Sequence, residues 1–158
     1  MVGLDALVEP QEKIAFQLDL WYISILIKQF REGGMGEIYL YLDDGAQVPQ
    51  ICKIPPFSEC NPVYGSSIGR GAFSFASGAW TSISQTITLN TMGKPDGKLS
   101  VSHNGKEVIA FNQVVWQSTT KVPFVGIQFE TFFGGSNPSW ATPKLQYSYY
   151  KDFSLSYN

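Results

Sequence analysis

Residues 99–111 read LSVSHNGKEVIAF, and this stretch decides the fold class. Two short runs, 99–103 and 106–111, flank a central Asn-Gly dipeptide, which strongly favours a two-residue β-hairpin turn. A turn of that length places His103 opposite Lys106 and Val101 opposite Val108, with all four side chains on one face. The stretch therefore predicts an antiparallel hairpin in which His103 and Lys106 are neighbours.

Similar short alternating runs, separated by Gly, Pro and Asn, continue through most of the chain. Helical periodicity is nearly absent, so the pattern is typical of an antiparallel β-sandwich or barrel. The apolar run at 21–27 fits a strand or a buried helix, and we interpret it as a strand. Four prolines make 48–67 a long loop. The remaining strands are expected at 37–42, 72–75, 80–90, 125–133 and 146–157.

Composition excludes several classes of protein. A chain of 158 residues, 44% hydrophobic and 15% charged, fits one globular domain and excludes a disordered chain or a coiled coil. A net charge of -2 provides no cationic field for nucleic acid. No apolar run reaches the roughly 18 residues that a membrane helix needs. With one His and two Cys, no metal site is expected. We expect a monomer.

Two features bear on the cellular compartment. Cys52 and Cys60 flank a proline-containing loop, which a disulfide would close in an oxidising compartment and which would stay open in a reducing one. The first ten residues lack the basic and apolar pattern of a signal peptide. Either the protein stays inside the cell or its leader is missing from this sequence.

Three stretches together resemble polysaccharide lyase family 14, in its fungal branch. They are CKIPPFSECNPVYGSSIGRG at 52–71, GIQFETFFGGSNPSW at 126–140 and ATPKLQYSYYKDFSL at 141–155. The resemblance covers about 33–157 and fades before it. We therefore divide the chain into an atypical N-terminal segment, 1–32, and a lyase-like jelly roll, 33–158, within the same domain.

The resemblance implies a fold and an activity. The fold would be an all-β jelly roll, an antiparallel β-sandwich with a substrate groove on its concave sheet. The activity would be cleavage of an anionic uronic-acid polysaccharide, alginate or glucuronan, by β-elimination without metal or cofactor. Such a protein would act outside the cell. In β-elimination a proton leaves C5 beside a carboxylate, so a cationic group must neutralise the charge that develops there.

The resemblance also implies catalytic residues. A lysine and two tyrosines one residue apart do this work in the family, and they match Lys106, Tyr147 and Tyr149. Tyrosine can act as base and acid when a nearby cation lowers its pKa. Animal and viral members carry a Ser and an Arg two positions apart on the preceding strand. Here Thr131 stands in for the Ser and no Arg follows, so Arg70 is the nearest alternative cation.

Other polar and aromatic residues are candidates for binding the substrate, each with a structural alternative. Gln128 and Glu130 mark the polar side of their strand, which suits sugar hydroxyls or plain solvent. Aromatic side chains such as Trp80 can stack on sugar rings or simply pack. The full set of candidate binding residues is Tyr39, Tyr41, Arg70, His103, Gln128, Glu130 and Thr131.

The last strand contains a conflict between burial and charge. A regular strand would place Tyr147 and Tyr149 in the core together with Leu155. The same register would bury Lys151, which costs several kcal/mol for an unpaired charge. A β-bulge between Tyr149 and Phe153 resolves the conflict and turns the tyrosines to the other face.

The sequence supports two functions of different classes. The first is a uronic-acid polysaccharide lyase, and the alternative is a carbohydrate-binding jelly roll without catalysis. A glycosidase is disfavoured because it needs two carboxyl groups about 5 to 10 Å apart, and Glu107 and Glu130 do not clearly share a face.

Overall fold

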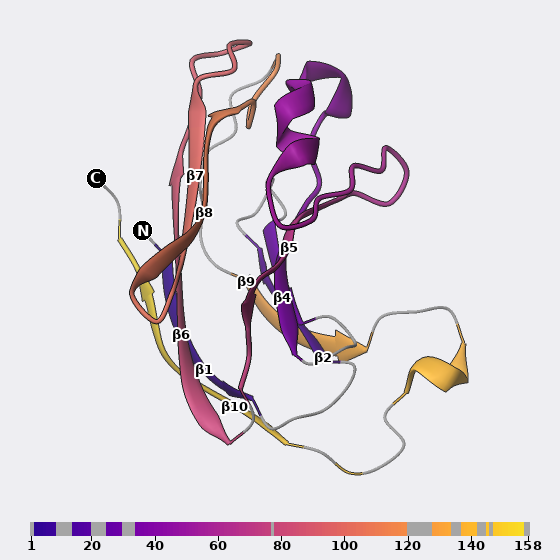
Figure 1. Cartoon of the computed structure of the whole chain (residues 1–158), viewed down its shortest axis with the longest axis vertical. Helices are drawn as coiled ribbons and strands as arrows, with labels where there is room; N and C mark the ends of the chain where they lie inside the picture. The colour runs from indigo at the N-terminus through magenta and orange to yellow at the C-terminus, as the bar shows by residue number, and fades with distance from the viewer. Residues whose placement is uncertain are drawn as a thin grey trace.

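The computed structural model describes residues 2–8, 14–19, 25–29, 34–76, 78–119, 128–133, 137–141, 145 and 147–156. Within these residues the chain forms ten strands and three short 3-10 helices (Figure 1). In chain order they are β1 (Val2–Val8), β2 (Ile14–Asp19), β3 (Ile25–Gln29), β4 (Met35–Leu40), η1 (Asp44–Ala46), η2 (Pro49–Lys53), β5 (Ser66–Ser74), β6 (Ala79–Thr88), β7 (Gly97–His103), β8 (Lys106–Val114), β9 (Gln128–Phe133), η3 (Pro138–Trp140) and β10 (Ser148–Leu155). No helix in this part of the chain has the length and apolar character needed to cross a membrane.

The strands pair into two five-stranded antiparallel sheets. Sheet A has the order β10-β1-β6-β7-β8, and sheet B has the order β5-β4-β3-β2-β9. One hydrophobic core contains side chains from both sheets, including Ile38 and Ile68 from sheet B and Ile83 and Val101 from sheet A. The chain is thus an antiparallel β-sandwich of the jelly-roll type, as the sequence predicts.

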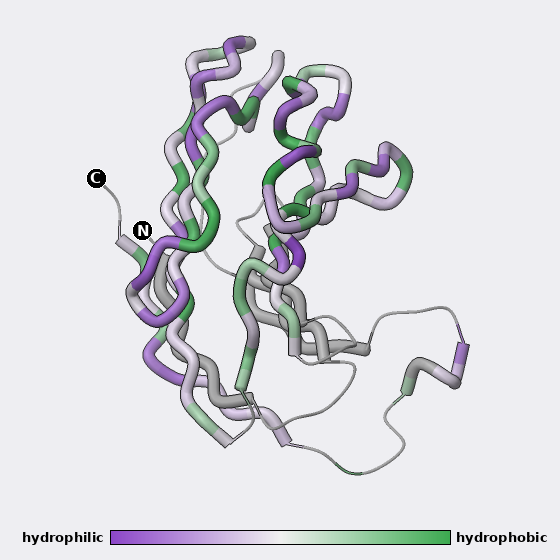
Figure 2. The backbone as a smooth tube through the Cα atoms, viewed as in Figure 1, coloured by the Kyte–Doolittle hydropathy of each residue, from purple (hydrophilic) through white to green (hydrophobic). Residues whose placement is uncertain are grey.

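The hairpin of β7 and β8 forms where the sequence predicts it. Asn104 and Gly105 have φ values of 51° and 77°, as the favoured two-residue turn requires. His103 pairs with Lys106, but Val101 pairs with Ile109. The predicted pairing of Val101 with Val108 is wrong because the register shifts within this ladder. Figure 2 shows hydrophobic and hydrophilic stretches along both strands of the hairpin.

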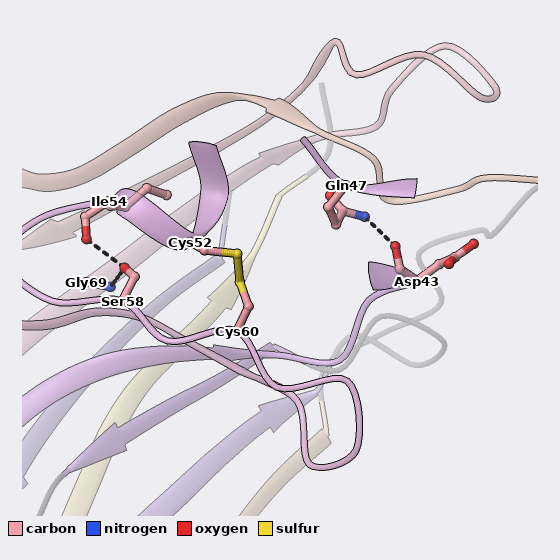
Figure 3. The surroundings of a disulfide bond; sticks show 7 residues. All are labelled: Asp43, Gln47, Cys52, Ile54, Ser58, Cys60 and Gly69. Carbon is pink, nitrogen blue, oxygen red and sulfur yellow. Dashed lines mark hydrogen bonds between the residues drawn. A yellow bond between two sulfur atoms is a disulfide. The ribbon is translucent and has the colours of Figure 1, made fainter. Parts of the chain in front are cut away.

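The proline-rich loop is shorter than predicted and is tied to sheet B. Residues 66–67 already belong to β5, so this strand is longer than the predicted 72–75. Cys52 and Cys60 form a disulfide (Figure 3), which settles the alternative that the sequence leaves open. Ser58 Oγ donates to the Ile54 carbonyl and accepts from the Gly69 N–H. The loop is therefore fixed beside β5.

The last strand contains the predicted bulge. β10 pairs with β1 from Ser148 to Lys151 and again at Ser154 and Leu155, with a register shift between the two parts. Asp152 lies in the shift and has a φ of 57°, in the left-handed region. The extra residue changes which side chains face the core. Tyr150 and Leu155 both pack against the core, although they are five positions apart.

We expect the free energy of unfolding to depend on how easily the residue at position 152 adopts a left-handed φ. Asp152→Gly should keep or slightly raise the free energy of unfolding, because glycine adopts left-handed φ values without steric cost. Asp152→Val should lower it by about 2 kcal/mol, since left-handed geometry is costly for branched residues. Asp152→Asn is the control, because it keeps the backbone preference and removes only the charge. Urea denaturation measures all three, and equal stability of the Gly and Val variants would contradict the bulge.

The disulfide should stabilise the fold. Replacing both Cys52 and Cys60 with Ser should lower the free energy of unfolding by about 2 to 3 kcal/mol, the loss expected for a loop of this size. Denaturation without reductant provides the measurement. Adding reductant should reduce the stability of the wild-type chain to that of the double variant and leave the double variant unchanged. A double variant as stable as the oxidised wild type would show that the crosslink does not contribute.

Candidate active site

Tyr149 faces solvent on β10 of sheet A, and Tyr147 is exposed directly before this strand. The side chains of Tyr147 and Tyr149 are 58% and 50% exposed, so they are not core aromatics. Their neighbour Tyr150 points the opposite way and packs against the core, where burial raises its pKa. The bulge at Asp152 thus gives the tyrosine pair the orientation that the sequence predicts. We name the surface of sheet A turned away from the core the outer face of sheet A.

Strand pairing places two further side chains beside this pair. Tyr149 pairs with Leu7, and Leu7 pairs with Trp80 on the next strand, so these three positions form one row across the sheet. Lys151 lies one row away, opposite Asp5. Its Nζ is 4.6 Å from the centre of the Trp80 ring. The Lys151 ammonium and the Trp80 ring are therefore in contact across β1.

Hydroxyl groups cover much of the rest of this face. On β6 the residues between the buried Thr81, Ile83 and Gln85 point outward, as the alternation in the sequence predicts. On β7 and β8, Ser100 Oγ donates to Glu107 Oε2 over 2.5 Å. The face combines two phenols, an indole ring, an ammonium group and several hydroxyls. Sugars are bound by aromatic stacking and by hydrogen bonds to hydroxyls, and a carboxylate pairs with an ammonium group.

Lys106 is not part of this cluster. Three strands, β1, β6 and β7, separate its strand from β10, which corresponds to about 19 Å at the usual spacing between strands. Lys106 pairs directly with His103, and His103 pairs with Ile83, a core residue. Directly opposed residues share a face, so Lys106 lies on the core side of the sheet, at the exposed end of the hairpin. The predicted convergence of Lys106 with the tyrosine pair is therefore wrong.

His103 has a packing role. Its ring stacks on Phe73, with ring centres 5.8 Å apart and an angle of 29° between the planes. Phe73 is a core residue on β5, so this contact links sheet A to sheet B at the end of the core. His103 therefore does not reach the outer face of sheet A.

Arg70 belongs to a second cluster, on sheet B. Its Nε donates to Glu37 Oε2 over 2.7 Å, and Ser67 Oγ donates to the same oxygen over 2.5 Å. The Glu37 side chain is only 2% exposed and that of Arg70 is 22% exposed. The guanidinium carbon lies 5.0 Å from the centre of the Phe57 ring. Arg70 is thus held by a buried carboxylate, away from the tyrosine pair, and does not act together with it.

Tyr39 and Tyr41 accompany Arg70 on sheet B. They share a face, as the alternation predicts, and their rings make an edge contact with centres 5.4 Å apart. The Tyr39 hydroxyl donates to the Tyr64 carbonyl oxygen over 2.5 Å. Burial, followed by the neighbouring Tyr41 and Glu37, raises the pKa of Tyr39. Tyr41 is 49% exposed and directly follows β4 of sheet B, so it lies away from the tyrosine pair.

The other predicted binding residues lie on β9. Gln128, Glu130 and Thr131 pair in register with Asp19, Gln17 and Phe16 of β2, in sheet B. Their side chains lie outside the described part of the structure, so their predicted contacts with substrate stay predictions. The described residues contain no group of His, Cys, Asp and Glu that could hold a metal ion.

Two residues beside the tyrosine pair and one on sheet B were not predicted as site residues from the sequence. Lys151 served only as an argument for the bulge, and Trp80 was weighed as packing. A signal for Lys151 was present, since the bulge that exposes Tyr149 must also expose the residue two positions later. Glu37 was overlooked as the buried partner of Arg70. Its alternation with Tyr39 and Tyr41 assigned it to the right face but gave no sign of burial.

Comparison with known proteins identifies the family. The family model of polysaccharide lyase 14 matches residues 28–153. Exolysin of Paramecium bursaria Chlorella virus 1 is 33% identical over 107 residues, which cover 66% of this chain and 16% of that protein. The chain thus spans only a small part of this viral relative.

Solved structures support the fold. The marine PL-14 alginate lyase of Aplysia kurodai superposes with a TM-score of 0.73 at 28% identity, over 96% of this chain and 67% of that one. The alginate lyase vAL-1 from Chlorella virus has a TM-score of 0.69 at 20% identity, over 96% and 69% of the two chains. The predicted jelly-roll sandwich is confirmed. Since the family model matches most of the sequence, the chain belongs to polysaccharide lyase family 14.

Proposed function

We propose that this protein is a lyase that cleaves an alginate- or glucuronan-type polysaccharide by β-elimination on the outer face of sheet A. The observation that carries the proposal is the exposed pair Tyr147 and Tyr149, two positions apart where β10 begins, with Lys151 on the same face. Family membership and the alginate lyases among the similar structures support the reaction class and the anionic substrate.

The two phenols can carry out both proton transfers of the reaction. One phenol, as the phenolate, takes the proton from C5 of the uronate. The electron pair of that C–H bond forms the C4–C5 double bond, and the C4–O bond breaks toward the glycosidic oxygen. The second phenol gives its proton to that oxygen. Exchange of protons with water then restores both side chains.

The spacing of the pair suits this division of work. Two positions along an extended chain are separated by about 7 Å. Tyr149 is the second residue of β10, and Tyr147 directly precedes this strand. One sugar linkage laid across β10 can therefore present its C5 proton to one phenol and its glycosidic oxygen to the other. The two tyrosines are equivalent in exposure. We therefore propose that the pair supplies one base and one acid, and we do not assign either role to one of the two.

A carbohydrate-binding protein without catalysis remains the second candidate. Two observations favour it: no Arg follows Thr131 in the sequence, and Lys106 lies away from the tyrosines. Both functions use the same exposed face, but only the lyase releases an unsaturated sugar. The product therefore separates them.

We further propose that the protein acts as a monomer outside the cell. The disulfide between Cys52 and Cys60 supports this location, because structural disulfides persist in oxidising compartments and are rare in the cytosol. The same location would bring the protein into contact with extracellular polysaccharides.

Replacing Tyr149 with Phe tests the proposed reaction. The variant keeps the ring and loses the hydroxyl, so kcat should fall by about 10²- to 10⁴-fold while binding of the polysaccharide is retained. Ultraviolet absorbance of the unsaturated product, measured with alginate, glucuronan and a neutral glucan, follows the reaction. The wild-type chain should act on one of the two polyuronates and leave the glucan intact.

Tyr41→Phe is the matched control, because Tyr41 is exposed to a similar degree but lies on sheet B. It should leave the rate within about twofold of wild type, as expected for a surface change away from the site. Unchanged turnover in Tyr149→Phe would remove the role assigned to this hydroxyl. Saturable binding with no unsaturated product from the wild-type chain would favour the non-catalytic function.

A further inference from the structure

We propose that Lys151 binds and neutralises the carboxylate of the sugar that loses its proton, and so is a further catalytic residue of this lyase. The inference rests on the proposed function and names the cation of the same site. It assigns to Lys151 the role that the family resemblance gives to Lys106.

The reaction needs a positive charge close to the phenols. Removing the C5 proton places a second negative charge on a group that already carries one, and a fixed cation stabilises that charge as it develops. The cation must face the same side of the sheet as the base, and it must lie within one sugar ring of it. Lys151 meets the first condition, because it alternates with Tyr149 on the exposed side of β10.

The contact with Trp80 meets the second condition. Tyr149 and Trp80 lie in one row, on strands separated only by β1. That separation is about 10 Å, or two strand spacings. The Lys151 Nζ is 4.6 Å from the Trp80 ring centre. Lys151 and Tyr149 are two positions apart on β10, a separation of about 7 Å. A cation–π contact of this kind fixes the position of an ammonium group without neutralising it.

The ion pair of Lys151 is easily exchanged for a substrate carboxylate. Its Nζ lies 3.3 Å from Asp152 Oδ2, and the two side chains are 48% and 64% exposed. Ion pairs with this much contact to water contribute little, typically below about 1 kcal/mol. A uronate carboxylate can therefore replace Asp152 while the contact with Trp80 is kept.

Three other cations with described side chains are placed less well. Arg70 is bound to the buried Glu37 on sheet B. Lys106 lies on the core side of sheet A, at the hairpin end. Lys98 points to the outer face but pairs with Thr88, eight positions along β6 from Trp80, a distance of about 27 Å. Among the described side chains, Lys151 is the cation next to the tyrosine pair.

The test compares Lys151→Gln with Lys98→Gln on two forms of one polyuronate, the free acid and its methyl ester. Both substitutions remove one positive charge from the same face. On the free acid, Lys151→Gln should lower kcat by about 10²- to 10³-fold, the usual loss when one charge-stabilising group is removed. On the ester one negative charge still develops as the proton leaves, but the carboxylate charge that Lys151 would bind beforehand is absent, so the deficit should shrink to less than about tenfold. Lys98→Gln should match the wild type on both forms.

The outcomes separate the two proposals. If the wild-type chain makes no unsaturated product from any uronate, the proposed function fails and the role of Lys151 fails with it. If the wild type is active and Lys151→Gln equals Lys98→Gln, only the role of Lys151 is overturned. An equal deficit on the acid and the ester would show that Lys151 does not act on the carboxylate charge and would also overturn the proposal. Lys106→Gln tests the rival assignment, and an acid-specific loss larger than that of Lys151→Gln would decide for Lys106.

Discussion

The site depends on one extra residue in β10. Without a bulge, a strand that buries Leu155 must also bury the tyrosines and Lys151, because side chains alternate strictly between the two faces. Asp152, in left-handed geometry, shifts the alternation of the strand, so that the even-numbered Tyr150 faces the core before it and the odd-numbered Leu155 faces the core after it. Leu155 then contributes to the core at one end, and Tyr149 and Lys151 reach solvent at the other. A single backbone irregularity thus joins the packing of the sandwich to its chemistry.

The cations Arg70 on sheet B and Lys151 on sheet A differ in how their charges are paired. On sheet B the charge of Arg70 is compensated within the fold by Glu37, whose carboxylate also accepts from Ser67. A buried carboxylate must be paired in this way, since an unpaired one would be strongly destabilising. On sheet A the charge of Lys151 rests on an indole ring and on an exposed Asp152. Of these two described cations, Lys151 is therefore the more accessible to an anion.

Much of the fold could be predicted from the sequence because its signals are local. Alternation predicted β4, β6 and β10, and the Asn-Gly dipeptide predicted the turn between β7 and β8. A regular strand that buries Leu155 would also bury the charge of Lys151, and the cost of burying that charge predicted the bulge. Strand order is different, because nothing in local alternation states that β1 lies between β10 and β6. The error over Lys106 has this origin: it was assigned to the tyrosine pair through a resemblance, and only the strand order shows that three strands intervene.

Strand alternation also selects which tyrosines are available for chemistry. Tyr149 and Tyr150 are adjacent in sequence and identical in type, but only the first faces solvent. Burial raises the pKa of Tyr150, and its side chain packs against the core. Tyr39 is likewise held by its hydrogen bond to the Tyr64 carbonyl and by burial that raises its pKa. The protein thus needs no special environment to choose among its phenols, because the direction of each side chain already separates those that can meet a sugar from those that stabilise the fold.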